Sequence, residues 1–174
     1  MERQSMGSIT WRPGPGIYLY GSQIDYFRDK VRYYNPLLAS GKRIKTWHSR
    51  TNFQGNRVVP DLPLLVPKER YQLVSHYKTV PEDRLHIVIY FYNRQGKEIE
   101  FIAFRDGLEE FICPEDNFTY CLVLVAAGCK ELEFHSIDFY HLDAQEPLNQ
   151  TVDNRSLTAE TLPSEFDLIR DLVN

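Results

Sequence analysis

The sequence predicts an all-β protein, an antiparallel β-sandwich. About nine short runs rich in β-branched and aromatic residues are separated by turns that contain Gly, Pro, Asn or Asp. Aromatic residues, which favour strands over helices, are plentiful, with 11 Tyr and 10 Phe. The chain shows neither a repeat of fixed period nor the alternation of strands and helices that builds a parallel sheet.

The clearest predicted element is a hairpin in the middle of the chain. Residues 85–92 form an unbroken apolar and aromatic run, which predicts a buried strand. The side chain of Asn93 can cap the following turn, and Gly96 can adopt the left-handed backbone conformation that closes it. Residues 97–104 then return as the second strand.

The N-terminal part predicts short strands joined by turns. Residues 1–8 are polar and are expected to form a flexible leader. In the last of the predicted strands, the period of two places Trp47 on one face with Lys45 and Ser49. The strands of this part are expected at residues 17–20, 24–27, 31–34 and 44–50.

A proline-rich connection, residues 52–67, follows these strands. Its apolar side chains are too numerous for a free loop, so we expect it to pack over one edge of a sheet. The side chains concerned are Leu62, Leu64, Leu65 and Val66.

The C-terminal part predicts four further strands. In the last of them the apolar parity changes between Phe134 and Ile137, which indicates either two buried faces or a β-bulge near Ser136. The strands are expected at residues 71–77, 111–113, 118–126 and 131–140.

These elements define one sandwich domain at residues 9–142. Residues 143–174 are interpreted as a polar linker and a short C-terminal helix, whose first turn has Ser164 as N-cap and acidic residues behind it. A length of 174 residues and a hydrophobic fraction of 43% suit one domain with a sizeable core.

Composition narrows the class of protein. A net charge of −4 disfavours a nucleic-acid partner, since such proteins are usually basic. Cys113, Cys121 and Cys129 are odd in number and without a close pair, which favours free thiols and a reducing compartment. No signal peptide or membrane-spanning run is visible, so we expect a cytoplasmic protein.

Motifs that would carry catalysis are weak. The chain has no G-x-S-x-G nucleophile elbow, and the segment Ser40-Gly41-Lys42-Arg43 departs from a phosphate-binding loop. The carboxylate pairs Glu98/Glu100 and Glu109/Glu110 are interpreted as a solvated strand face and a loop. We therefore expect no enzyme activity and no cofactor.

A metal site is also not expected. The five histidines are scattered and none has metal-ligand spacing with a cysteine. Asp106, Asp116 and Asp138 could supply oxygens to a structural calcium, which leaves that ion open, but nothing in the sequence fixes a site.

The order of elements from residue 66 to 142 resembles the jelly-roll sandwich of carbohydrate-binding modules and galactose-binding-like domains. In those folds a proline-led turn precedes a Tyr-x-Leu strand, here Pro67 and then Tyr71-Gln72-Leu73. A long strand, a glycine-closed hairpin and the remaining strands follow in the same order. This resemblance supports the fold far better than the function.

Exposed aromatic and apolar side chains are the candidate binding residues. Sugar-binding sandwiches stack Trp or Tyr on pyranose rings, and Trp47, Tyr90 and Tyr92 are candidates for that role. The alternative is that these aromatics fill the core, which the energetics of aromatic burial favours. For a protein partner, the candidate anchors are Trp47 and the proline-rich connection with Leu62, Leu64 and Leu65.

A more specific resemblance lies in the N-terminal half. Tyr18-Leu19-Tyr20-Gly21-Ser22, Asn35-Pro36-Leu37-Leu38, Ser40-Gly41, Trp47 with Ser49, Asn52-Phe53 and Pro63-Leu64-Leu65 follow in order. Over roughly residues 9–142 the chain resembles the third accessory secretory protein of the Gram-positive accessory Sec system. The motif residues are Tyr18, Tyr20, Gly21, Asn35, Pro36, Gly41, Asn93 and Gly96.

The resemblance implies a non-enzymatic scaffold or chaperone component of the accessory Sec complex. Such a component binds the first and second accessory secretory proteins and aids delivery of glycosylated serine-rich repeat adhesins to a dedicated SecA motor. The resemblance places it in the cytoplasm and leaves open a peripheral contact with the inner face of the membrane through the complex. The alternative is a carbohydrate-binding module that recognises glycans on a substrate protein.

Overall fold

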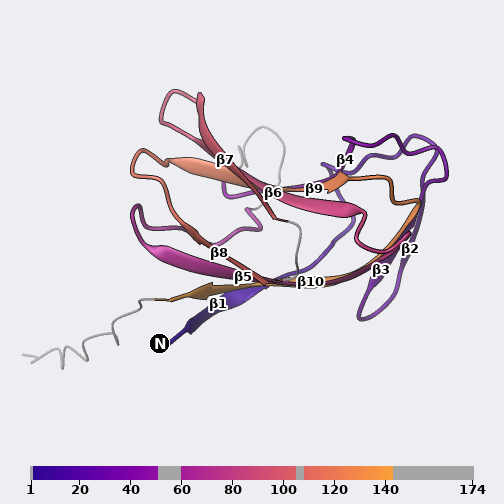
Figure 1. The fold of residues 1–174 in the computed structure, drawn as a ribbon, viewed down its shortest axis with the longest axis horizontal. Coiled ribbons are helices and arrows are strands. Elements are labelled where there is room, and N and C mark those ends of the chain that lie inside the picture. The colour runs from indigo at the N-terminus through magenta and orange to yellow at the C-terminus, as the bar shows by residue number, and fades with distance from the viewer. Residues whose placement is uncertain (1, 51–59, 105–107, 143–174) are drawn as a thin grey trace, which may run out of the picture. The chain divides into compact units, whose positions relative to one another are not determined.

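The computed structural model describes residues 2–50, 60–104 and 108–142. Every regular element in these ranges is a strand, and the strands form two antiparallel sheets that lie one above the other (Figure 1). The predicted antiparallel β-sandwich is therefore confirmed. The predicted linker and helix at 143–174 lie outside the described residues.

The larger sheet has six strands in the order β2-β3-β10-β5-β8, with β1 paired to β10 beside β3. The long strand β10 is its centre, because β5 covers one edge while β3 and β1 share the other. The strands of the larger sheet are β1 (Gln4–Ile9), β2 (Gln23–Tyr26), β3 (Val31–Tyr34), β5 (Arg70–Val80), β8 (Leu108–Ile112) and β10 (Glu131–His141).

The smaller sheet has four strands in the order β4-β9-β6-β7. Its two central strands are the most apolar runs of the chain, and their inward side chains meet those of the larger sheet in one core. The strands of the smaller sheet are β4 (Arg43–His48), β6 (Leu85–Tyr92), β7 (Glu98–Phe104) and β9 (Thr119–Ala126).

The central hairpin β6–β7 forms as predicted. The Asn93 side-chain oxygen accepts hydrogen bonds from the backbone N–H groups of Gln95 and Lys97, both at 3.0 Å. Gly96 has a φ of 76°, in the left-handed region that glycine adopts without strain. The turn is therefore held by one side chain and one permissive backbone position.

The parity change in the last strand is a β-bulge. The pairing of β10 with β5 shifts register between Phe134 and Ser136, as the sequence predicts. Phe134 and Ile137, on either side of the shift, are both fully buried. One extra residue thus lets a long strand keep a single face in the core.

Two N-terminal expectations are wrong. The leader predicted at residues 1–8 is instead largely the strand β1, whose backbone pairs with the end of β10. The strand predicted at 17–20 is reduced to a single bridge between Ile17 and Lys45, and Tyr20 in it is 82% exposed. At both places, whether a strand forms depends on backbone pairing with a free strand edge and not on the apolar pattern of the sequence.

Candidate interaction surface

Trp47 is a core residue and not a surface anchor. Its side chain is 1% exposed, and its indole Nε1–H donates to the backbone oxygen of Thr10 at 3.3 Å. Its ring lies 5.4 Å from that of Phe134 and 6.4 Å from that of Trp11 between centroids. The predicted roles of Trp47 in partner or sugar binding are therefore corrected, because the strand face shared by Lys45, Trp47 and Ser49 points inward.

The described part of the proline-rich connection packs on the sandwich through some of its leucines. Leu62 is 6% exposed and belongs to the core, and Leu65 packs partly against it. Leu64, by contrast, is 76% exposed. Of the three predicted leucine anchors, only Leu64 is fully presented to a partner, and Asn52 and Phe53 lie outside the described residues.

Tyr90 and Tyr92 lie on the outer face of the smaller sheet, half-buried. Tyr90 pairs with Phe101 of β7 at 6.0 Å between ring centroids, and the Arg43 guanidinium lies 4.8 Å from the Tyr90 ring. The Tyr92 hydroxyl contacts the Sγ of Cys121 at 3.8 Å, and burial raises its pKa to about 12. These two tyrosines keep their predicted candidacy as surface residues.

Next to Tyr92 the outer face carries a hollow of about 340 Å³. Two arginines from β4 and its end bring positive charge to it, whereas burial lowers the pKa of His48, which also lines it, and so favours the neutral imidazole. No spacing motif in the sequence signals this hollow. Its lining residues are Arg43, Thr46, His48, Arg50, Tyr92, Gly96, Thr119, Tyr120 and Cys121.

An arginine–aromatic stack continues this surface at the end of the sandwich. The Arg50 guanidinium lies 4.0 Å from the ring of Phe118, and that of Arg94 lies 5.5 Å from the same ring. A second hollow, of about 500 Å³, adjoins Phe118 and Arg94 and is lined also by Glu115 and Asp116. Cationic side chains from separate segments thus converge on one aromatic ring.

The family-motif residues have mainly structural positions. Asn35 is 1% exposed, and its side-chain amide donates to the backbone oxygen of Tyr20 at 2.9 Å and to Ser22 Oγ at 3.0 Å. Its side-chain oxygen accepts from the N–H of Leu37 at 3.1 Å. Asn35 therefore ties two loops together, with the exposed Tyr20 and Leu37 on them. The remaining motif residues are Tyr18, Gly21, Pro36, Gly41, Asn93 and Gly96, which lie in or beside turns.

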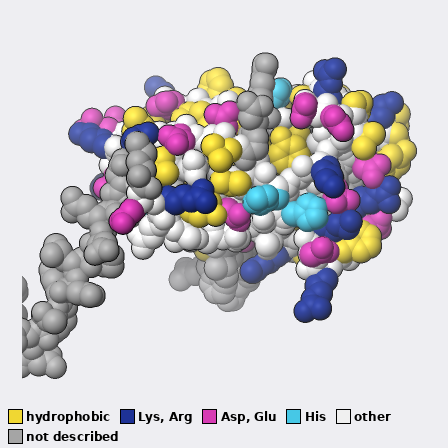
Figure 2. Space-filling model, turned by 60° about the horizontal axis from the view of Figure 1, so that its bottom comes forward, with side chains coloured by type: hydrophobic (Ala, Val, Ile, Leu, Met, Phe, Trp, Pro, Cys, Tyr) yellow, Lys and Arg dark blue, Asp and Glu magenta, His cyan; other side chains and the backbone are white. Residues whose placement is uncertain are grey.

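The outer face of the larger sheet differs from that of the smaller sheet, because it carries basic side chains paired with acidic ones. Lys30 pairs with Glu133 at 3.2 Å, and Arg32 pairs with Glu131 at 2.7 Å. His76 contacts Asp138 at 3.0 Å. Figure 2 shows this face with basic, acidic and histidine side chains side by side. Several of its charges pair within the face, as in an ordinary solvated surface.

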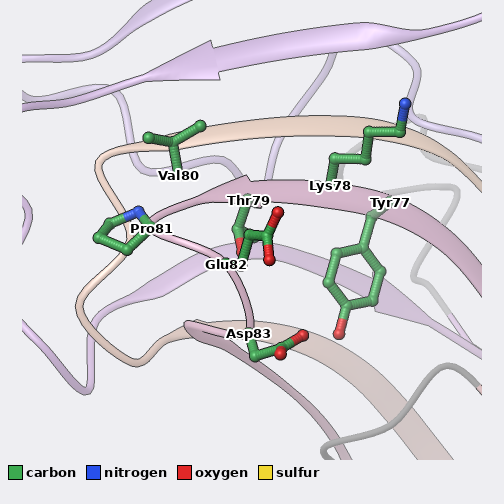
Figure 3. A pocket seen from close by; sticks show the side chains of 7 residues that line it. All are labelled: Tyr77, Lys78, Thr79, Val80, Pro81, Glu82 and Asp83. Carbon is green, nitrogen blue, oxygen red and sulfur yellow. The ribbon is translucent and has the colours of Figure 1, made fainter.

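The opposite end of the sandwich carries a hollow of about 620 Å³. It is lined by Tyr77 to Asp83, one continuous stretch at the end of β5 and the turn after it. Figure 3 shows Lys78 and Val80 on one side of the strand and Tyr77 and Thr79 on the other. Because one stretch supplies the whole lining, the hollow does not bring together residues from distant parts of the chain.

The histidines, cysteines and acids of the described ranges do not gather into a metal site. Among residues 2–50, 60–104 and 108–142, no group of three or more His, Cys, Asp or Glu side chains is placed to hold a metal ion. Asp106, one of the calcium candidates, lies outside those ranges, and Asp138 is engaged by Ser8 and His76. No helix of the described part has the length and apolarity needed to cross a membrane.

Comparison with known proteins assigns the chain to a family. The model of the accessory Sec secretory system ASP3 family matches residues 17–141. The chain belongs to this family. The match covers the described sandwich from Ile17 to the end of β10 and leaves out the C-terminal part of the chain.

Two curated relatives agree with the assignment. The accessory Sec system protein ASP3 of Streptococcus gordonii is 36% identical over 121 residues, which cover 69% of this chain and 76% of that protein. The protein of the same name in Staphylococcus aureus is 24% identical over 149 residues, covering 85% of this chain and 47% of that longer relative.

Two solved structures are also similar. One chain of the crystal structure of accessory secretory proteins 1, 2 and 3 of Streptococcus pneumoniae matches with a TM-score of 0.75 and 38% identity, covering 78% of this chain and 95% of that one. The Gap123 glycosylation-associated protein complex of Streptococcus agalactiae matches with a TM-score of 0.73 and 29% identity, covering 82% and 46%.

Proposed function

We propose that this chain is the non-enzymatic third component of an accessory Sec complex and that it binds counterparts of the first and second accessory secretory proteins. One observation carries the proposal. The sandwich is 38% identical to, and covers 95% of, a chain of a structure that contains accessory secretory proteins 1, 2 and 3. Because the two chains share a fold at that identity, we expect this chain to assemble with counterparts of the same proteins.

The geometry of the described surface fits a binding role. Its convergent polar groups are arginines stacked on aromatic rings, together with a face of mutually neutralised charges. Large exposed apolar side chains, among them Tyr20, Leu37 and Leu64, stand on loops anchored to a rigid core. Exposed apolar and aromatic groups ringed by polar ones are typical of protein interfaces.

The proposal extends to export. In this role the chain works in the cytoplasm, at the inner face of the membrane when the complex meets its SecA motor, and helps keep a serine-rich repeat adhesin competent for export. The carbohydrate-binding alternative is weakened because Trp47, its main stacking candidate, is 1% exposed. Tyr90 and Phe101 remain as the aromatic surface that a glycan could use.

Deletion and complementation test the export role. Deleting the gene in its own host should abolish surface display of the serine-rich repeat adhesin while leaving general secretion intact. The wild-type chain should restore display. Full adhesin display in the deletion strain, measured by flow cytometry with an anti-adhesin antibody, would refute the export part of the proposal.

A further inference from the structure

The smaller sheet and the adjoining end of the sandwich carry a surface that the proposed function does not yet use. We name it the arginine face, made of Arg43, Arg50 and Arg94 with the rings of Tyr90 and Phe118. Arg43 lies over Tyr90 at 4.8 Å, and Arg50 and Arg94 lie over Phe118 at 4.0 and 5.5 Å. Stacking on a ring fixes a guanidinium in place while its N–H edge stays open to a partner.

The guanidinium groups of the arginine face lack ion-pair partners in the part of the chain that the structure describes. Within the described residues, no carboxylate lies within ion-pair distance of Arg43, Arg50 or Arg94. On the larger sheet, by contrast, Lys30, Arg32 and other cations pair with acidic residues. Three arginines that lack an ion pair in the described residues thus lie together on one surface of a chain whose net charge is −4.

Acidic side chains border the arginine face. Glu115 pairs with Lys68 at 2.6 Å, at the hollow beside Phe118. Asp116 lines the same hollow. Glu98 follows the turn at the start of β7, and its charge acts on Tyr92 and Cys121. These acids border the face and would restrict a docked anion to the hollow between Arg43 and Arg50, which both line it.

We propose that the arginine face docks an acidic segment of a partner protein in the accessory Sec complex. Planar guanidinium groups match carboxylates in a two-point hydrogen-bonded geometry, and two of them line one hollow of about 340 Å³. Phe101, 59% exposed beside Tyr90, offers an apolar contact for residues next to the acidic ones. The proposal rests on the proposed function, since its partner is one of the other accessory secretory proteins.

Neutralising the face in the full chain tests the proposal. The triple variant Arg43→Gln/Arg50→Gln/Arg94→Gln should bind the two partner proteins at least about tenfold more weakly than wild type, because docked charge pairs contribute on this scale. The matched control is Arg12→Gln/Arg28→Gln/Lys78→Gln, which changes the net charge equally at exposed sites away from the face. The control should bind as wild type does.

Further measurements separate the outcomes. The thermal unfolding midpoints of the glutamine variant and of the control should match that of wild type, since the substituted side chains are exposed. The charge-preserving variant Arg43→Lys/Arg50→Lys/Arg94→Lys should recover only part of the affinity if the planar geometry matters. Binding isotherms at rising salt should converge for wild type and the glutamine variant, because screening weakens exposed charge interactions.

Specific results would overturn the inference. Equal affinity of the glutamine variant and wild type would do so while leaving the proposed function intact. If the control variant lost the same affinity for the partners, the effect would come from net charge and not from the arginine face. Retention of the protein complex, together with loss of binding to a sialylated oligosaccharide or to phosphatidylglycerol vesicles, would assign the face to a different ligand. If wild type itself bound neither partner protein, the proposed function would be refuted, and the inference that rests on it would be refuted with it.

Discussion

The indole of Trp47 is packed between the two sheets, so its removal should damage stability before it affects binding. We expect Trp47→Ala to lower the free energy of unfolding by about 3–5 kcal/mol, through lost burial and the cavity left behind. Urea denaturation followed by circular dichroism measures this. Phe101→Ala, at a side chain 59% exposed, is the control and should shift the midpoint little. An unchanged midpoint for Trp47→Ala would place this tryptophan outside the core.

Cys113 should make the fold sensitive to alkali. Burial raises the pKa of its thiol from 9.0 to about 11. Because the folded pKa is above the unfolded value, the stability from the neutral thiol is complete below pH 9 and is lost as pH rises toward 11. The unfolding midpoint of wild type should therefore fall over this range more steeply than that of Cys113→Ala. Parallel pH profiles for the two proteins would contradict the assignment.

Individual residues show what a single sequence can and cannot reveal. The period of two correctly groups Lys45, Trp47 and Ser49, which are all buried. It cannot say which face of the strand points inward, because an aromatic residue suits a core and a binding face equally well. The bulge between Arg43 and Lys45, which also buries Ile44, has no mark in the sequence pattern.

Among the connecting elements, two glycines of similar backbone conformation have different surroundings. Gly16 and Gly96 have φ values of 78° and 76°. A Cβ at Gly16 would lie 2.8 Å from the backbone oxygen of Thr46, whereas one at Gly96 would have no heavy atom within 4 Å. Both alanine variants carry a backbone cost of about 1–2 kcal/mol. We expect Gly16→Ala to be clearly more destabilising in urea unfolding, and equal midpoints would show that the segment before Ile17 shifts freely.

Strand prediction succeeded where burial determines the element and failed where backbone pairing does. The apolar runs of β6 and β9 are unmistakable, and the parity change locates the β10 bulge. Strand β1 (Gln4–Ile9) is mostly exposed and polar, so only its pairing with β10 reveals it. The apolar residues 17–20 lack a partner strand for more than one bridge.

At the scale of the whole molecule, the two outer faces differ in how their charges are handled. The larger sheet pairs several of its charges internally, while the smaller sheet and its end present arginines on aromatic rings (Figure 2 shows the former face). Arg43 and Arg50 come from β4 and its end, whereas Arg94 comes from the β6–β7 turn far along the sequence. Their convergence depends on the hairpin turn meeting the end of β4, so no motif or spacing could have predicted it.

The assembly itself provides the decisive measurement. The purified full chain, mixed with the first and second accessory secretory proteins of the same host, should sediment in analytical ultracentrifugation as one complex that contains all three proteins. Each pairwise mixture serves as the reference for its own sedimentation coefficient. If the first two proteins associate while this chain sediments alone at micromolar concentration, its role as the third component of the complex is contradicted.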